Sequence, residues 1–148
     1  MSERSLIMQA SVVVIGGRAL AIEGPPGSGK SALALALIDR GAHLIGDDGV
    51  TLTRTDTAII AAPPPNIAGL IEVHGVGLVT LPVAPPAPLA LVLTLGAPVD
   101  RLPSAAPARD ILGIAIPCLP FDPGTIAPAL RAEWALKQHG LSSAPNQS

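Results

Sequence analysis

Short apolar runs separated by glycine- and proline-rich segments follow one another along most of the chain. Residues 11–15 (SVVVI) are typical of a strand, and Gly16-Gly17 predicts a tight turn into a returning strand at residues 19–23. Further apolar or alternating runs predict strand segments at residues 44–45, 50–54, 58–61, 71–81, 89–95 and 112–116. The hydrophobic pattern therefore predicts a domain built mainly on a β-sheet.

Two segments have the features of helices. Residues 31–40 (SALALALIDR) are rich in Ala and Leu, contain no helix breaker and end at Gly41. Residues 129–139 form the clearest part of a second helix, which stops at Gly140. Together with the strands, these helices predict an α/β fold with a mixed β-sheet.

The length of 148 residues allows one domain but not two full cores. The prolines separate predicted strands and do not form a linker between domains. We therefore expect a single domain over residues 1–140, with a loop at residues 96–110, and a disordered polar tail over residues 141–148.

Composition excludes several classes of function. The chain is 49% hydrophobic, carries a formal net charge of −2 and has one Phe, one Trp and no Tyr, which argues against a nucleic-acid partner. No apolar run approaches the roughly 18 residues that a membrane-spanning helix needs, so we expect no membrane insertion. The single cysteine, Cys118, cannot form an internal disulfide, and this is compatible with a cytoplasmic location.

One motif carries a specific chemistry. Residues 24–31 satisfy the phosphate-binding loop pattern G-x4-G-K-S, with a predicted strand before it and a predicted helix after it. In such a loop, backbone N–H groups surround a phosphate, Lys30 reaches the β- and γ-phosphates, and the Ser31 hydroxyl binds Mg²⁺. A purely structural strand–helix turn is the alternative. The residues predicted to bind the ATP phosphates are Gly24, Pro25, Pro26, Gly27, Ser28, Gly29, Lys30 and Ser31.

Acidic residues follow at positions suited to a phosphate-transfer site. Asp47-Asp48 ends a short apolar segment, where one carboxylate can hold Mg²⁺ and the other can accept a proton, although Asp-Asp-Gly also suits a solvated turn. Glu72 lies within an apolar strand and needs a partner such as a metal ion, unless it faces solvent. His74 lies on the same strand face as Glu72 and either contacts phosphate or covers the sheet.

Glycines and arginines near these acidic residues leave further alternatives open. Gly75 and Gly77, on either side of Val76, allow a close backbone approach to phosphate or a tight bend. Arg101 and Arg109 in the predicted loop either bind an anion or remain solvated.

The sequence resembles the catalytic domain of the bacterial HPr kinase/phosphorylase family over residues 11–136. The similarity lies in GPPGSGKSALALALIDRG, HLIGDDGV and IAGLIEVHGVGLV, and the later DRLP and IPCLPFDP resemble the short alphaproteobacterial form. The resemblance implies a fold like that of phosphoenolpyruvate carboxykinase and a hexameric homo-oligomer. It also implies Mg²⁺- and ATP-dependent phosphorylation of a serine of the HPr phosphocarrier protein of the phosphotransferase system, and the reverse phosphorolysis.

The same resemblance implies roles for individual residues. Asp47 would be the base that accepts the serine proton, with Lys30 as a second catalytic residue, and Ser31, Asp48 and Glu72 would surround Mg²⁺.

The sequence also departs from the family pattern. Ala32 stands where an acidic residue is usual, His74 where Arg is usual and Gln9 where His is often found. These departures leave open the alternative of a nucleotide-sensing module without phosphate transfer. A small-molecule kinase is a further alternative, but it would need a pocket rich in Arg and aromatic side chains, which this sequence lacks.

Overall fold

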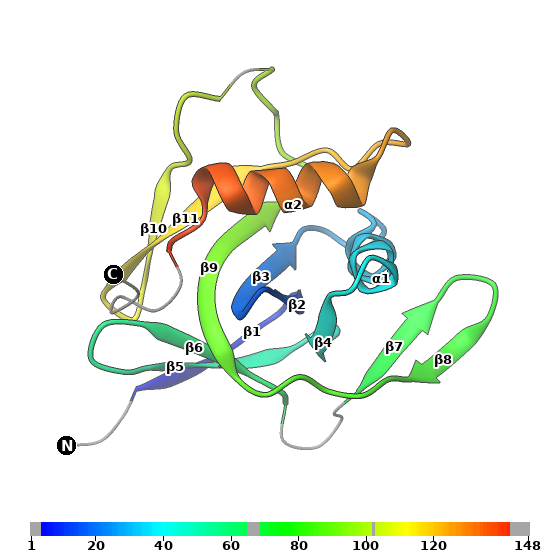
Figure 1. The fold of residues 1–148 in the computed structure, drawn as a ribbon, viewed down its shortest axis with the longest axis horizontal. Coiled ribbons are helices and arrows are strands. Elements are labelled where there is room, and N and C mark those ends of the chain that lie inside the picture. The colour runs from blue at the N-terminus through cyan, green and yellow to red at the C-terminus, as the bar shows by residue number, and fades with distance from the viewer. Residues whose placement is uncertain (1–3, 65–68, 102, 143–148) are drawn as a thin grey trace.

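The computed structural model describes residues 4–64, 69–101 and 103–142. Figure 1 shows its strands and two helices. The strands are β1 (Ser5–Met8), β2 (Ser11–Ile15), β3 (Arg18–Glu23), β4 (His43–Gly46), β5 (Val50–Arg54), β6 (Ile59–Ala62), β7 (Leu70–Val73), β8 (Gly77–Thr80), β9 (Ala87–Thr94), β10 (Ala108–Ile111) and β11 (Ile114–Pro120). The helices are α1 (Lys30–Asp39) and α2 (Pro128–His139).

The described strands form one mixed 9-stranded sheet and a separate β7–β8 pair. The sheet runs in the order β1-β5-β6-β9-β3-β2-β4, and β11 joins it beside β9 and pairs in turn with β10. Strand β9 is parallel to both β3 and β11, whereas β2 is antiparallel to β3 and β4. The α/β class with a mixed sheet is therefore confirmed.

Successive side chains of the central strands point to opposite faces of the sheet, and each face carries its own apolar core. On β3, Leu20 and Ile22 pack into the core that α1 and α2 cover, while Ala19 and Ala21 face the core completed by β5 and β6. Helix α1 is apolar on most sides because it is enclosed by α2, β2 and β7. In Figure 1, α2 lies across the sheet, and the β7–β8 hairpin projects at the end of the molecule opposite β10 and β11.

Most of the predicted elements are confirmed. The β2–β3 hairpin, helix α1, the β5–β6 hairpin, the central strand β9 and helix α2 occur within one or two residues of their predicted bounds. The expected tail falls partly outside the described residues, which end at position 142. Within them, the Leu141 N–H donates to the Ala90 carbonyl.

The structure differs from the predicted strands in two places and refines a third. The segment 71–81 contains the two strands β7 and β8, joined by the tight bend that was one alternative for Gly75 and Gly77: Gly75 (φ 79°) and Gly77 (φ 120°) adopt positive φ, and the Val76 N–H donates to the Val73 carbonyl. The predicted loop at residues 96–110 ends in β10, and the last strand begins only at Ile114, after a turn in which Leu112 has φ 53°. Strand β1 was not predicted, because it is an edge strand whose first three residues are exposed.

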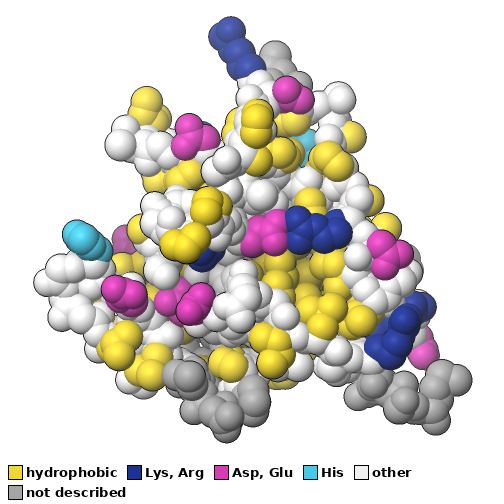
Figure 2. Space-filling view, turned by 180° about the vertical axis from the view of Figure 1, so that it is seen from behind, with side chains coloured by type: hydrophobic (Ala, Val, Ile, Leu, Met, Phe, Trp, Pro, Cys, Tyr) yellow, Lys and Arg dark blue, Asp and Glu magenta, His cyan; other side chains and the backbone are white. Residues whose placement is uncertain are grey.

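No helix in the described ranges is long and apolar enough to cross a membrane. On the face in Figure 2, Lys and Arg side chains are scattered and do not merge into a basic patch.

Strand β9 lies in the interior of the sheet, so a large-to-small substitution at one of its buried residues should be costly. Leu93 is fully buried, so Leu93→Ala removes packed methyl groups and is expected to lower the free energy of unfolding by about 2–5 kcal/mol. Denaturant unfolding followed by circular dichroism measures the change. The control is Leu78→Ala, since Leu78 is 73% exposed and its loss should change stability by less than about 0.5 kcal/mol. Equal effects of the two substitutions would contradict the placement of β9 in the core.

Candidate active site

The predicted phosphate-binding loop lies between the end of β3 and the start of α1. Gly29 caps the helix with φ 99°, a backbone conformation that glycine adopts without strain. A Cβ on Gly24 would lie 2.7 Å from Ser28 Oγ and 3.0 Å from the Leu95 carbonyl oxygen, so this position also requires glycine. The backbone of the loop at Gly24 thus lies close to the backbone of Leu95. The loop leads into the N-terminus of α1, whose partial positive charge favours a bound phosphate.

Lys30 is the first residue of α1, and its side chain turns back over the loop. Its Nζ donates to the Gly24 carbonyl at 2.8 Å and to the Pro25 carbonyl at 3.4 Å. The hydroxyl of Ser28 is buried and has no hydrogen-bond partner among the described residues. A phosphate held in this loop would offer oxygen atoms to both groups, which fits the predicted role.

Asp47 directly follows β4 and faces the start of α1. Ser31 Oγ lies 2.8 Å from Asp47 Oδ1 and 3.0 Å from Oδ2, and Ser11 Oγ lies 2.6 Å from Oδ1. The Glu72 amide donates to Oδ2 at 3.4 Å. The carboxylate is therefore joined to the phosphate loop, to strand β2 and to the β7–β8 hairpin.

A cavity of about 810 Å³ gathers most of the predicted site residues. This volume lies within the range usual for small-molecule sites. Its lining comes from β2, the phosphate loop and α1, the turn after β4, and the β7–β8 hairpin. The lining residues are Ser11, Pro26, Gly27, Gly29, Lys30, Ser31, Ala32, Leu35, Asp47, Asp48, Glu72, Val73 and His74.

The structure thus brings Lys30, Ser31, Asp47, Asp48 and Glu72 to one cavity, together with His74. Arg101, Arg109 and Gln9 do not line it. Sequence reasoning missed Ser11, which lines the cavity and is the polar residue found in the buried core of the described chain. Its only sequence signal was a polar residue at the head of the apolar run SVVVI.

The oxygen atoms around the cavity suit a magnesium ion. Ser31, Asp48 and Glu72 supply a hydroxyl and two carboxylates, the hard donors that Mg²⁺ prefers. Among the described residues, no three His, Cys, Asp or Glu side chains already form a metal-binding group. Mg²⁺ is commonly held by one or two carboxylates and substrate phosphates rather than by a protein cage, so the residues fit the ion.

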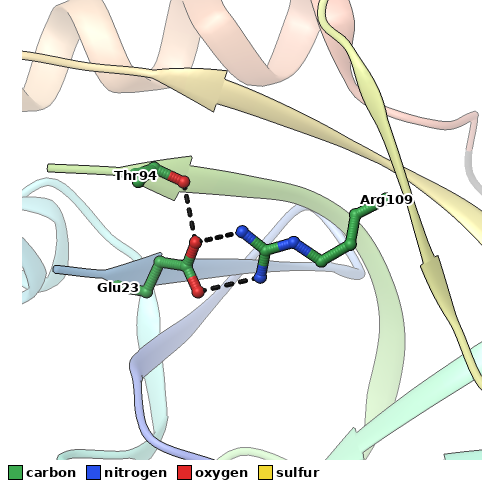
Figure 3. A network of polar contacts seen from close by, with 3 residues as sticks. All are labelled: Glu23, Thr94 and Arg109. Atoms are coloured by element: carbon green, nitrogen blue, oxygen red, sulfur yellow. Dashed lines mark hydrogen bonds and ion pairs between the residues drawn. The ribbon is translucent and has the colours of Figure 1, made fainter. Parts of the chain in front are cut away.

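A second polar cluster lies at the carboxyl ends of β3 and β9, where the phosphate loop begins. Figure 3 shows the Glu23 carboxylate facing the Arg109 guanidinium, which contacts both carboxylate oxygens, while the Thr94 hydroxyl donates to Oε2 at 2.8 Å. The hydrogen bond from Arg109 is the main cause that holds the pKa of Glu23 below its usual value, against the opposing effect of burial. Arg109 is therefore engaged with Glu23 and does not face the cavity.

This ion pair makes a testable contribution to stability. Because the pKa of Glu23 is lower in the folded protein than its ordinary value of 4.5, the ion pair's stabilisation is complete above pH 4.5 and is lost as pH falls through the folded-state pKa. The difference in free energy of unfolding between wild type and Glu23→Gln should therefore be larger at pH 7 than at pH 3. Urea unfolding at both values measures it. If the difference in free energy of unfolding between the two proteins is the same at both pH values, or is larger at pH 3, the charge of Glu23 does not contribute to stability.

Comparisons with known proteins agree with the geometry. The family model of the HPr serine kinase C-terminal domain matches residues 2–84. The chain is 32% identical to the HPr kinase/phosphorylase of Clostridium acetobutylicum over 89% of its own length and 48% of the relative. It is 40% identical to that of Clostridium botulinum over 46% of its length and 22% of the relative. The chain thus spans about half or less of the curated relatives it matches.

A solved structure supports the same assignment. The chain superimposes on the Hpr(Ser) kinase/phosphatase from Coxiella burnetii with a TM-score of 0.74 and 29% sequence identity, covering 89% of each chain. A similarity over 89% of the chain extends beyond residues 2–84, which the family model matches. By its family model, its relatives and its fold, the chain belongs to the HPr serine kinase C-terminal domain family.

Proposed function

We propose that this protein transfers the γ-phosphate of ATP to a serine hydroxyl of an HPr-type phosphocarrier protein. The observation that carries the proposal is that Asp47 and the loop residues Lys30 and Ser31 face one cavity, with Ser31 Oγ 2.8 Å from the Asp47 carboxylate. A proton acceptor beside a phosphate-binding loop is the arrangement that a hydroxyl nucleophile requires. The names of the relatives supply the carrier protein as substrate.

In this mechanism the phosphate loop and the start of α1 hold the ATP phosphates, and Lys30 turns from the Gly24 carbonyl to them. Ser31, Asp48 and Glu72 would hold Mg²⁺, which offsets the negative charge of the phosphates when it is bound. The serine oxygen forms a bond to the γ-phosphorus as the bond to the β,γ-bridging oxygen breaks. The serine proton passes to Asp47. In the reverse direction, Asp47 returns this proton while inorganic phosphate takes the phosphoryl group and forms pyrophosphate.

The lining of the cavity favours a protein substrate over a small anionic one. Its described residues contain no Arg, Phe, Tyr or Trp, the groups that a small-molecule kinase uses to surround its acceptor. A nucleotide-sensing module remains the competing function, because Ala32 lies in the lining at the position where the family usually carries an acidic residue.

A transfer assay separates these functions. The protein is incubated with γ-labelled ATP, Mg²⁺ and HPr from a bacterial phosphotransferase system, and a carrier whose acceptor serine is replaced by Ala is the control. Label on HPr but not on the control supports the proposal. Tight ATP binding without label on HPr would favour the sensor and overturn the proposal.

The proposal includes a homo-oligomer in the cytoplasm, the compartment that holds both ATP and the carrier. Large apolar side chains remain exposed on one chain, such as Ile126 at 79% and Ile7 at 67%, and burial against further copies would remove them from water. Light scattering of the purified protein measures the assembly. A mass of one chain at assay concentration would contradict this part of the proposal.

A further inference from the structure

The hydrogen bond from Ser11 to Asp47 is short, and its donor is buried beside the cavity. Ser11 opens β2 and is fully buried, and its Oγ lies 2.6 Å from Asp47 Oδ1. A hydroxyl in an apolar core is costly unless it has a partner, and the carboxylate supplies one. Ser11 is also one of the residues that line the cavity. Ser11 is thus both buried in the protein core and in contact with the cavity.

Strand β2 is a fixed support for this contact. Ser11 pairs with Ile22 of β3, and the next residue, Val12, pairs with Gly46 immediately before Asp47. The Gly49 N–H donates to the Ala10 carbonyl, which attaches the acidic turn to β2 a second time. The other donors to Asp47, Ser31 and the Glu72 amide, belong to the phosphate loop and the β7–β8 hairpin, which line the ligand space.

The two oxygens of Asp47 are held unequally. Oδ1 accepts the short hydrogen bond from Ser11, at 2.6 Å, and the single hydroxyl proton of Ser31 is shared with a shorter distance to Oδ1 (2.8 Å) than to Oδ2 (3.0 Å). The other donor to Oδ2, the Glu72 amide, is more distant, at 3.4 Å. An oxygen with weaker donors keeps more of its capacity to accept a proton.

We propose that Ser11 is a positioning residue for Asp47: its hydroxyl fixes Oδ1 to the sheet and leaves Oδ2 to accept the proton of the substrate serine. The inference rests on the function proposed above. Gln9, two residues before Ser11, is exposed and does not line the cavity, so the contact from the start of β2 to Asp47 comes from Ser11.

Substitutions that differ only in the hydroxyl test the proposal. Thr and Val have nearly the same shape, so Ser11→Thr and Ser11→Val form a matched pair, and Ser11→Ala removes the hydroxyl without adding volume. We expect Ser11→Ala and Ser11→Val to lower kcat for HPr phosphorylation by about tenfold or more, because a misplaced base loses alignment with its substrate. Ser11→Thr should recover most of that loss. The KM for ATP and the Kd for ATP without carrier should stay within about twofold, because Ser11 acts through Asp47 and not on the phosphates.

The result that overturns the proposal is a hydroxyl-free variant with wild-type kcat, or one whose loss appears equally in ATP affinity. Crystal structures of wild type and Ser11→Ala give a readout independent of turnover. The Asp47 carboxylate should hold one orientation in wild type and change orientation in Ser11→Ala; the same orientation in both would refute the positioning role. If wild type itself fails to label HPr, the proposed function fails, and the orientation of Asp47 still decides the role of Ser11.

Discussion

Asp47→Asn is expected to lower kcat for phosphate transfer to HPr by about a thousandfold while leaving ATP binding nearly unchanged. The amide has the shape of the carboxylate and can still accept hydrogen bonds from Ser11 and Ser31 through its oxygen, so the site should keep its geometry. It cannot accept the proton of the attacking serine. Rapid-quench measurement of labelled HPr gives kcat, and a fluorescent ATP analogue gives the affinity.

Asp48→Asn is the matched control, because Asp48 is the neighbouring carboxylate in the same cavity. Asp48 is exposed and adopts φ 65°, a conformation that Asn tolerates as well as Asp does. As a proposed metal ligand, it should raise the Mg²⁺ concentration required for half-maximal rate, and excess Mg²⁺ should restore much of kcat. If Asp47→Asn instead recovers with Mg²⁺ and Asp48→Asn does not, the roles of the two residues are reversed.

Lys30→Ala is expected to weaken ATP binding by about 10- to 100-fold and to abolish detectable transfer. Lys30 is the one Lys or Arg side chain in the described lining of the cavity, so no other cation there replaces it against the phosphates. Its present partners are two backbone carbonyls, and its removal leaves no buried charge unpaired. Calorimetric titration with ATP and Mg²⁺ measures the affinity.

The chain offers a matched control in its other lysine, Lys137. This residue lies on α2 with its Nζ 4.8 Å from the centre of the Trp134 ring, and it does not line the cavity. Lys137→Ala should therefore bind ATP like wild type. Thermal unfolding of both variants shows whether the fold persists. ATP binding by Lys30→Ala at wild-type affinity would contradict a phosphate role for the loop.

The site residues that sequence reasoning found belong to short continuous motifs. In the phosphate loop, one run of eight residues supplies the backbone turn, the cation and the hydroxyl, so its chemistry follows from local spacing. Asp47 and Asp48 follow a short apolar segment, and Glu72 interrupts another. Each is conspicuous because a carboxylate next to an apolar strand needs a partner.

The contacts that sequence reasoning missed join residues far apart along the chain. Ser11 and Asp47 are 36 positions apart, and Glu23 and Arg109 are 86 positions apart. By sequence alone, a serine at the head of a strand has no distinct signal, and an arginine in a predicted loop either binds an anion or remains solvated. Only the pairing of β2 with β4, and the approach of β10 to the end of β3, make them members of polar networks.

The sequence by itself determined the local elements whose signals lie within a few residues: the glycine turn of β2–β3, the phosphate loop with α1, and the apolar strand β9. Tertiary structure alone decided that β10 is a strand and that Ser11 reaches Asp47, and it selected the tight bend at Gly75 and Gly77 from the two alternatives that the sequence left open. The reason is physical. Backbone propensity and turn chemistry act between neighbouring residues, whereas sheet order and side-chain hydrogen bonds depend on which distant segments the burial of apolar surface brings together.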